Sequence, residues 1–354
     1  MTPMPRLLAA AAVLTLVAGC ASRPVVRPDG VTVIRSYRFE TTVADPQPAW
    51  NPVTYLIVSR HAEGFALYQE GAGRQEFFSA DDRRSSYLPQ WLNRDQFVFC
   101  GPVNATRDAE GRVLPSTAGL TVVSVKDDGR RCAVERHVLA DRGFRPRVAH
   151  EEVYAQTGRT MVVVDRYGAV KDAGEGFWAE PQPEGRGVTY QETPVVDPDL
   201  WTAKPPRGTL FIRWKPGVVS SVPGATQARW TPTGGVVCTV LRGDPPADRP
   251  WWTPGTDVVY VAGPEAQPII LARDARDPAP HPNQPLVAVA ARDGGVRLVA
   301  YDPTVPARTL VTQGRSPQWS WDGLRLLAEE PRPSRPDATV LNVQVLKLTP
   351  VAAP

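Results

Sequence analysis

Histidine and cysteine are scarce in this chain, which has only four of each among its 354 residues. The four histidines, at positions 61, 137, 150 and 281, lie far apart and form no H-x-x-x-H pair, and no two cysteines have the spacing of metal ligands. The sequence therefore predicts no metal site and no cofactor.

Catalytic motifs are also missing. The chain has no G-x-S-x-G turn for a nucleophilic serine, no phosphate-binding P-loop and no G-x-G-x-x-G motif opening a helix. The acidic pairs Glu151-Glu152 and Glu329-Glu330 are expected to be solvated, because neighbouring residues of a strand point to opposite faces. No catalytic residue is predicted. The alternative is a pair of carboxylates for glycoside hydrolysis that the fold brings together from distant segments of the chain.

Concentrated positive charge is absent. The 40 basic and 37 acidic residues give a net charge of +3, and the two signs are interspersed along the chain. Because nucleic-acid binding needs a basic patch that neutralises phosphates, no nucleic-acid partner is expected. The sequence also has no run of 18 apolar residues, so no segment is predicted to span a membrane as a helix.

Proline, by contrast, is abundant: its 38 residues are about 11% of the chain, roughly twice ordinary usage. Each proline removes a backbone donor and fixes φ, which excludes long helices over most of the chain. From about Ile34 onward, short runs rich in strand-forming residues alternate with turn residues, which is typical of an all-β protein. The clearest hairpin joins residues 286–291 to 296–301 through Asp293-Gly294-Gly295.

The first twenty residues have the layout of an export signal. Arg6 supplies a positive start, residues 7–17 are apolar, and residues 16–20 read LVAGC. This ending resembles the bacterial lipobox, in which the cysteine is acylated and the signal is cut before it. The resemblance implies a signal peptide over residues 1–19, a lipidated Cys20 with a tether over 20–33, and a main domain over 34–354.

The implied acyl chains would hold the protein at a membrane, because each buried CH₂ contributes about 0.8 kcal/mol. Ala21 is not the aspartate that signals inner-membrane retention. The expected location is therefore the outer membrane facing the periplasm in an organism with two membranes, and otherwise the outer face of the cytoplasmic membrane. A plain secretory signal with a chance cysteine is the alternative.

A phrase centred on tryptophan recurs along the body of the chain. Its four clear copies are PAWNP at 48–52, PQWLNRD at 89–95, ARWTPTG at 228–234 and PQWSWDG at 317–323. With weaker copies beginning at Arg145 and His281, the intervals are 41, 54, 85, 51 and 38 residues. Periods near 40 to 50 residues with several short strands each predict a β-propeller of four-stranded blades. Six blades are favoured, and seven are expected if the long interval holds one more.

The last copy resembles the repeat of TolB-type propellers, a tryptophan followed by Ser-Pro, Asp-Gly and a hydrophobic strand. Trp319, Ser320, Asp322 and Gly323 match that repeat, whereas Trp321 stands where the family has proline. The resemblance implies that the repeat tryptophans pack between blades and do not contact a ligand. These residues are Trp50, Trp91, Trp230 and Trp319.

Two segments depart from the repeat. Residues 172–217 and 242–254 are rich in proline and tryptophan and contain few strand candidates. Long irregular loops are often functional, and exposed tryptophan on a proline-stiffened backbone suits protein binding. A partner-binding surface is therefore predicted at Trp178, Trp201, Trp251 and Trp252. Packing of these rings between blades is the alternative.

Three cysteines remain once Cys20 is assigned to lipid. Cys100 and Cys132 fall in one expected blade, and export favours disulfides. A Cys100–Cys132 bond is predicted; it would close a loop of about 30 residues and contribute about 3 to 4 kcal/mol in the chain-entropy model. Cys238 lies in an apolar run and is expected to be a buried thiol.

Together these features favour a non-catalytic scaffold, a lipid-anchored propeller that presents one face to another envelope protein or to the cell wall. The alternative is a periplasmic carbohydrate-binding or hydrolytic propeller with a site at its central channel. Converging acidic or histidine side chains with perturbed pKa values in the channel would favour the enzyme. An exposed aromatic patch beside a plain channel would favour the scaffold.

Overall fold

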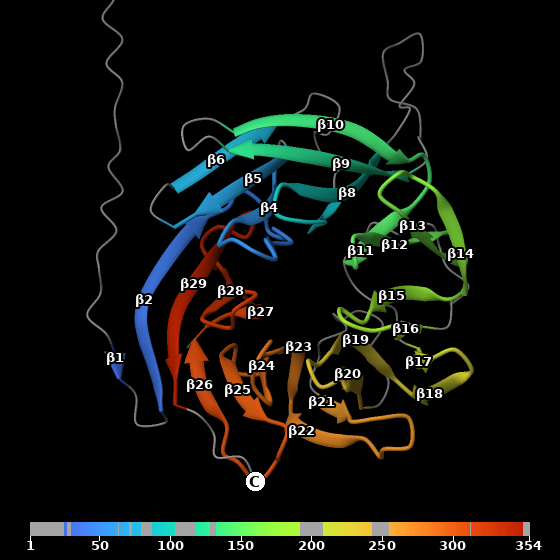
Figure 1. Ribbon diagram of the computed structural model, residues 1–354. Coiled ribbons are helices and arrows are strands. Elements are labelled where there is room, and N and C mark those ends of the chain that lie inside the picture. The colour runs from blue at the N-terminus through green and yellow to red at the C-terminus, as the bar shows by residue number, and fades with distance from the viewer. Residues whose placement is uncertain are drawn as a thin grey trace, which may run out of the picture.

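The computed structural model describes residues 25–26, 30–62, 64–70, 73–78, 87–102, 118–127, 132–191, 208–242, 255–311 and 313–349. The strands form seven antiparallel sheets arranged as blades around a central axis (Figure 1). The predicted all-β propeller is confirmed, and its blade number is seven. Within the described ranges, no helix has the length and apolar character needed to cross a bilayer.

Blades 1 to 3 each consist of four consecutive strands, the first of which lies innermost. Blade 1 contains β3 (Ala49–Trp50), β4 (Ile57–His61), β5 (Gly64–Gln69) and β6 (Gly73–Phe78). Blade 2 contains β7 (Tyr87–Trp91), β8 (Gln96–Pro102), β9 (Ala118–Asp127) and β10 (Cys132–Ala140). Blade 3 contains β11 (Phe144–Ala149), β12 (Glu152–Thr157), β13 (Thr160–Val164) and β14 (Val170–Glu175).

Blades 4 to 6 follow the same order. Blade 4 contains β15 (Phe177–Pro181), β16 (Val188–Gln191), β17 (Leu210–Lys215) and β18 (Val218–Val222). Blade 5 contains β19 (Ala225–Trp230), β20 (Val236–Leu241), β21 (Thr256–Val261) and β22 (Ile269–Arg273). Blade 6 contains β23 (Ala275–Pro280), β24 (Leu286–Ala291), β25 (Val296–Ala300) and β26 (Arg308–Val311). Blade 4 lies within the 85-residue interval, which is why seven blades are present and not six.

Blade 7 closes the ring by combining both ends of the described chain. Its inner strands are β27 (Arg315–Trp319), β28 (Arg325–Pro331) and β29 (Thr339–Leu348). The next strand outward is the N-terminal β2 (Val31–Glu40), to which the two-residue β1 (Val25–Val26) pairs. β2 and β29 are antiparallel from Val31 opposite Leu348 to Glu40 opposite Val340. The propeller thus begins at least three residues before the boundary expected at residue 34.

Side chains reinforce the seam between blades 7 and 1. Arg325 donates to both carboxylate oxygens of Glu70, and its guanidinium lies 3.3 Å from the centre of the Tyr55 ring. The Tyr55 hydroxyl donates to Asp322 Oδ2 at 2.8 Å. An aromatic ring, two carboxylates and an arginine therefore connect the first and last blades.

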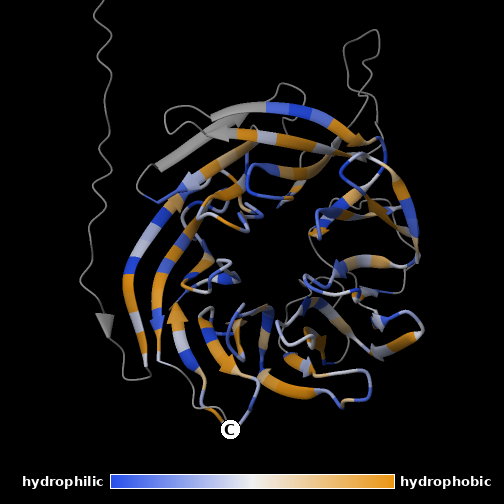
Figure 2. Cartoon of the chain, in the orientation of Figure 1, coloured by the Kyte–Doolittle hydropathy of each residue, from blue (hydrophilic) through white to orange (hydrophobic). Residues whose placement is uncertain are grey.

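The hydrophobic core is divided among the blade interfaces. Buried apolar side chains form clusters that each draw on adjacent blades, such as Phe65 of β5 with Phe97 of β8, whose ring centres are 5.5 Å apart. All six residues of β24 are buried, because this strand is covered on both faces. Hydrophobic and hydrophilic residues alternate along β2 at the rim, where one face meets solvent (Figure 2).

The innermost strand of every blade carries the same backbone irregularity. At this irregularity each blade has one non-glycine residue with a φ between 46° and 62°: Gln47, which lies two residues before β3, and Leu88, Arg145, Trp178, Gln227, Asp277 and Ser316. Proline follows this residue in five of the seven blades. A proline without an N–H fits a bulge, where the extra residue makes no ladder bond. The repeat is therefore a bulge, then usually proline, then one variable residue, then usually tryptophan.

This repeat corrects one alignment made from sequence. The copy expected at His281 begins at Asp277 instead, since Asp277 carries the positive φ and Pro278 follows it. In that blade Pro280 occupies the position that tryptophan holds elsewhere. The copy at Arg145 is placed correctly.

Candidate functional site in the central channel

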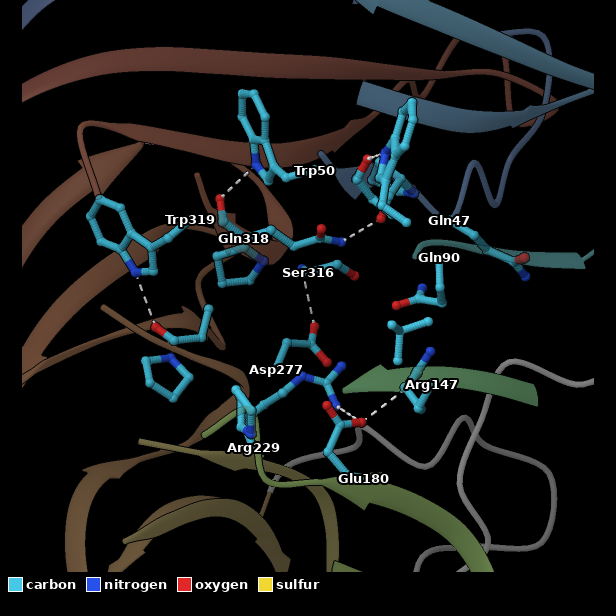
Figure 3. A pocket seen from close by; sticks show the side chains of 18 of the residues that line it. Gln47, Trp50, Gln90, Arg147, Glu180, Arg229, Asp277, Ser316, Gln318 and Trp319 are labelled. Atoms are coloured by element: carbon cyan, nitrogen blue, oxygen red, sulfur yellow. Dashed lines mark hydrogen bonds and ion pairs between the residues drawn. The ribbon is translucent and has the colours of Figure 1, made fainter. Parts of the chain in front are cut away.

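The variable residue of each repeat faces the propeller axis. Together with its neighbours it lines a cavity of about 550 Å³ to which all seven blades contribute (Figure 3). From blade 1 to blade 7 these seven residues are Ala49, Gln90, Arg147, Glu180, Arg229, Ala279 and Gln318. The bulge turns each of these side chains inward. The same backbone irregularity, repeated in every blade, therefore directs seven different side chains into one cavity.

Blades 3 to 5 contribute both guanidinium groups of the channel and one carboxylate. Glu180 Oε2 accepts hydrogen bonds from Arg147 Nε at 2.9 Å and from an Arg229 terminal nitrogen at 3.0 Å (Figure 3). Two guanidinium groups thus share one carboxylate, leaving a net positive charge on this side. Elsewhere around the cavity the charged groups in the lining are the carboxyl side chains of Asp45, Asp277 and Glu329.

Bulge residues of neighbouring blades are hydrogen-bonded to one another. Gln227 Oε1 accepts from the backbone N–H of Asp277 at 3.2 Å, and Asp277 Oδ2 accepts from the backbone N–H of Ser316 at 3.2 Å. In blade 1, Gln47 Oε1 accepts from the backbone N–H of Leu88 at 2.9 Å. These bonds connect the strained positions and hold the inner strands in register around the channel.

One carboxyl group at the channel wall has an unusual protonation equilibrium. Glu329 of β28 is 4% exposed and lines the channel cavity, and its Oε2 accepts from Arg315 Nε at 3.2 Å. Burial raises the pKa of Glu329 to about 8, although the nearby Arg315 opposes this shift. The expectation that Glu329 is solvated is therefore wrong, because its strand faces the interior.

The four repeat tryptophans have the structural role predicted for them. Each indole N–H donates to a backbone oxygen on the innermost strand of the preceding blade: Trp50 to Gln318, Trp91 to Ala49, Trp230 to Glu180 and Trp319 to Ala279. The donor–acceptor distances run from 2.9 to 3.4 Å. The rings therefore connect successive blades.

Trp178 is not an exposed partner-binding residue. It is the bulge residue of blade 4, and its half-buried indole packs against the buried cluster of blades 2 and 3 and covers the Arg145 guanidinium. The other three tryptophans of the predicted surface, Trp201, Trp251 and Trp252, lie outside the described residues, as does Cys20.

The strand register is incompatible with the predicted Cys100–Cys132 disulfide. Cys100 of β8 pairs with Leu120 on β9, whereas Cys132 of β10 pairs with Asp127. Leu120 and Asp127 are seven positions apart, about 23 Å along a strand. A disulfide needs Cα atoms within about 7 Å. Cys238 is fully buried, as predicted.

The histidine that the structure places near the channel has a structural role. His281 packs on Trp319 with ring centres 4.7 Å apart, its Nε2 lies 3.2 Å from Gly323 O, and its Nδ1 accepts from the backbone N–H of Asn283. Burial lowers its pKa, which favours the neutral ring. In the portion of the chain that the structure describes, no three His, Cys, Asp or Glu side chains are grouped to hold a metal.

An apolar rim surrounds one mouth of the channel. Pro52, Pro183, Pro282 and Trp321 all line the cavity and lie in the turns that follow the innermost strands. Trp321 is 48% exposed and stacks on Tyr55 with ring centres 6.4 Å apart. In the same two turns of the chain, Val53 and Leu324 are more than half exposed. This rim was not predicted from sequence, although the departure of Trp321 from the repeat was visible there.

Comparison with known proteins gives the fold alone. No protein-family model matches the chain, and no curated protein matches it in sequence. Among solved structures, hydrazine synthase of Kuenenia stuttgartiensis is similar with a TM-score of 0.52 at 12% identity, over 85% of this chain and 96% of that one. The tricorn protease is similar with a TM-score of 0.52 at 10% identity, over 83% of this chain and 33% of that one. These structural similarities show a shared propeller fold. At such low identity they say nothing about the chemistry of this chain.

Proposed function

We propose that this protein is a lipid-anchored propeller of the cell envelope that acts as a protein-binding scaffold through the rim of its channel. The observation that carries this proposal is the exposed Trp321 beside Val53 and Leu324. Rigid aromatic side chains at the centre of an apolar patch supply much of the binding energy in protein interfaces.

The Trp321 ring is held in place before any partner arrives. It stacks on Tyr55, whose hydroxyl is bonded to Asp322 and whose ring also contacts the Arg325 guanidinium. Such preorganisation lowers the entropy cost of binding. The neighbouring Trp319 makes the interblade hydrogen bond, so Trp321 is not needed for that contact.

Crosslinking in intact cells tests the scaffold. The full-length chain with a C-terminal tag is crosslinked, purified and analysed by mass spectrometry. One dominant envelope protein is expected, lost in Trp321→Ala and retained in Tyr167→Ala, which removes an exposed aromatic from the outer turn of blade 3. A double Trp251→Ala, Trp252→Ala variant tests the surface predicted from sequence. Enrichment of no protein from wild-type cells would contradict the scaffold.

Anchoring is tested separately. Cys20→Ser is expected to move the protein from the membrane fraction to the soluble fraction and to abolish labelling by a fatty acid. Retention of the variant in the membrane fraction would contradict lipidation at Cys20.

A hydrolytic or carbohydrate-binding role is the second candidate, and Glu329 is the observation that favours it. A carboxyl group protonated near pH 7 at a channel wall is suited to general acid catalysis, while Glu180 is held by two arginines. Screening with chromogenic glycosides tests this role. Activity that disappears in Glu329→Gln would support it, whereas inactivity of the wild type on every glycoside tested would count against it.

A further inference from the structure

A second, smaller cavity lies behind the charged side of the channel. Its volume is about 90 Å³, and it shares Arg147, Glu180 and Arg229 with the channel wall. The rest of its polar lining comes from blades 3, 4 and 5: Arg145, Trp178, Thr189, Gln191 and Gln227. The cavity is therefore separated from the channel by the Arg147–Glu180–Arg229 cluster.

Four polar atoms in this lining are buried and have no hydrogen-bond partner among the described residues: Arg145 Nε, Trp178 Nε1, Thr189 Oγ1 and Gln191 Oε1. Thr189 is 0% exposed, Gln191 is 1% exposed and Arg145 is 7% exposed. Buried polar groups in proteins are nearly always hydrogen-bonded, so this concentration around one cavity is unusual. It makes this cavity a candidate site for a bound molecule.

The orientation of the Gln191 amide is fixed. Its Nε2 donates to the backbone oxygen of Ala225 at 2.8 Å, which leaves Oε1 as the unpartnered atom. An amide oxygen can only accept, so a molecule that satisfies it must carry an O–H or N–H group. The Thr189 hydroxyl can accept as well as donate.

The positive charge around the cavity favours binding of an anion. Arg145, Arg147 and Arg229 line it, and the one carboxylate in its lining, Glu180, is already bonded to Arg147 and Arg229. Arg145 lies against the Trp178 ring, and no carboxylate of the described residues is paired with it. Because a guanidinium stays charged in proteins and a buried charge without a counter-charge is costly, this arrangement favours a ligand with a negative group.

We propose that this cavity binds a small hydroxycarboxylate. The ligand's carboxylate accepts from Arg145 and from the indole N–H of Trp178, and its hydroxyl donates to Gln191 Oε1 or Thr189 Oγ1. The volume is about that of three water molecules in the liquid, which admits a molecule of two or three carbons. This inference does not depend on the scaffold function, because it involves none of the rim residues.

Calorimetric titration of the purified full-length chain tests the proposal. Glycolate and lactate are the probes, and acetate, glycolamide and inorganic phosphate are the comparisons. Saturable binding of glycolate or lactate is expected. Acetate is expected to bind at least threefold more weakly because it lacks the hydroxyl, and the neutral glycolamide at least tenfold more weakly because it lacks the charge.

Variants identify the site. Arg145→Gln is expected to weaken glycolate binding at least tenfold, whereas Arg142→Gln, which removes an exposed charge from the turn before β11, leaves it unchanged. Trp178→Phe keeps an aromatic ring, removes the indole donor and is expected to weaken binding severalfold. Thermal unfolding without ligand shows that each variant is folded, and Arg145→Gln is expected to unfold at or above the wild-type temperature.

Four results would overturn the proposal. They are no saturable binding of glycolate or lactate to the wild type, equal binding of glycolamide, binding of phosphate alone, and undiminished binding by folded Arg145→Gln. If the rim variants did not affect crosslinking, the scaffold function would be contradicted but the hydroxycarboxylate site would not, since the two experiments use different residues and different readouts.

Discussion

The indole N–H of Trp230 donates to the backbone oxygen of Glu180 at 2.9 Å across the seam between blades 5 and 4. The same Glu180 uses its side chain to hold Arg147 of blade 3 and Arg229 of blade 5. One residue of an inner strand therefore links three successive blades, by its backbone on one side and by its carboxylate in the channel.

Trp230→Phe isolates the interblade hydrogen bond. Phenylalanine preserves much of the ring packing and leaves the Glu180 oxygen without its donor, so we expect a loss of about 1 to 2 kcal/mol in the free energy of unfolding. Denaturant unfolding monitored by circular dichroism measures it. Trp321→Phe is the control, because that exposed ring makes no such bond, and a loss of similar size in both variants would contradict the role of the bond.

Glu180→Gln is expected to destabilise the propeller more than its exposure suggests. Removing the carboxylate leaves Arg147 and Arg229 close together without a counter-charge, which should cost about 1 to 3 kcal/mol. Chemical denaturation at low and high salt measures the effect, which should shrink as salt screens the repulsion. Glu184→Gln, at an exposed position of the next turn, serves as the control.

Glu329 makes stability depend on pH. Its pKa is raised from 4.5 to about 8 in the folded protein, so the native state binds more protons than the unfolded state between these values. The stabilisation of the folded state by this group is fully present below about pH 4.5 and is lost as pH rises towards 8. The free energy of unfolding falls by at most about 1.4 kcal/mol per pH unit over this range. Glu329→Gln should flatten this part of the profile, as measured by unfolding at a series of pH values. An unchanged profile would contradict the raised pKa.

The buried thiols should be inert in the native state. Burial raises the pKa of Cys100 to about 11 and that of Cys238 to about 12, so few thiolates exist at pH 8. Alkylation followed by peptide mass spectrometry should label neither residue in the folded protein and both after unfolding. A peptide pair joined between Cys100 and Cys132 would contradict the strand register.

Ring closure depends on β2. Removing residues 1–30 should leave a folded propeller, whereas removing residues 1–40 exposes the edge of β29 and should cause aggregation, because an unpaired hydrophobic strand pairs with other chains. Size-exclusion chromatography and thermal unfolding distinguish the two truncations. A monomeric, equally stable 41–354 protein would contradict this account.

The sequence predicts the propeller, with six blades favoured and seven allowed, and the reason that the seventh blade is hard to recognise is specific. In blade 4 the repeat reads Trp178-Ala179-Glu180-Pro181, which lacks both the proline of the second position and the tryptophan of the fourth. The backbone irregularity persists there without its usual residues, because the fold of the neighbouring blades imposes it. A repeat that is conserved among the blades in backbone conformation but not in residue type is visible only in the structure.

The sequence repeat marks the positions of the channel residues but not their importance. Arg147, Arg229 and Gln318 each stand two positions after a bulge residue, and the phrases containing them were recognised by their proline or tryptophan. The residue between proline and tryptophan varies, so a search for repeated letters passes over it. The Cys100–Cys132 pairing failed because register along β9 depends on loop lengths that composition does not determine.

The pairing of β2 with β29 joins residues that are about 300 positions apart, as in the bond from the Thr41 hydroxyl to Thr339 O. A contact of such high sequence separation forms late, because the entropy of closing the loop must be paid before the contact contributes. Until β29 is in place, β2 has no neighbouring strand on its inner side and blade 7 cannot close the ring. Closure of the ring therefore finishes only with the last strand, and a chain truncated within β29 would remain an unclosed ring.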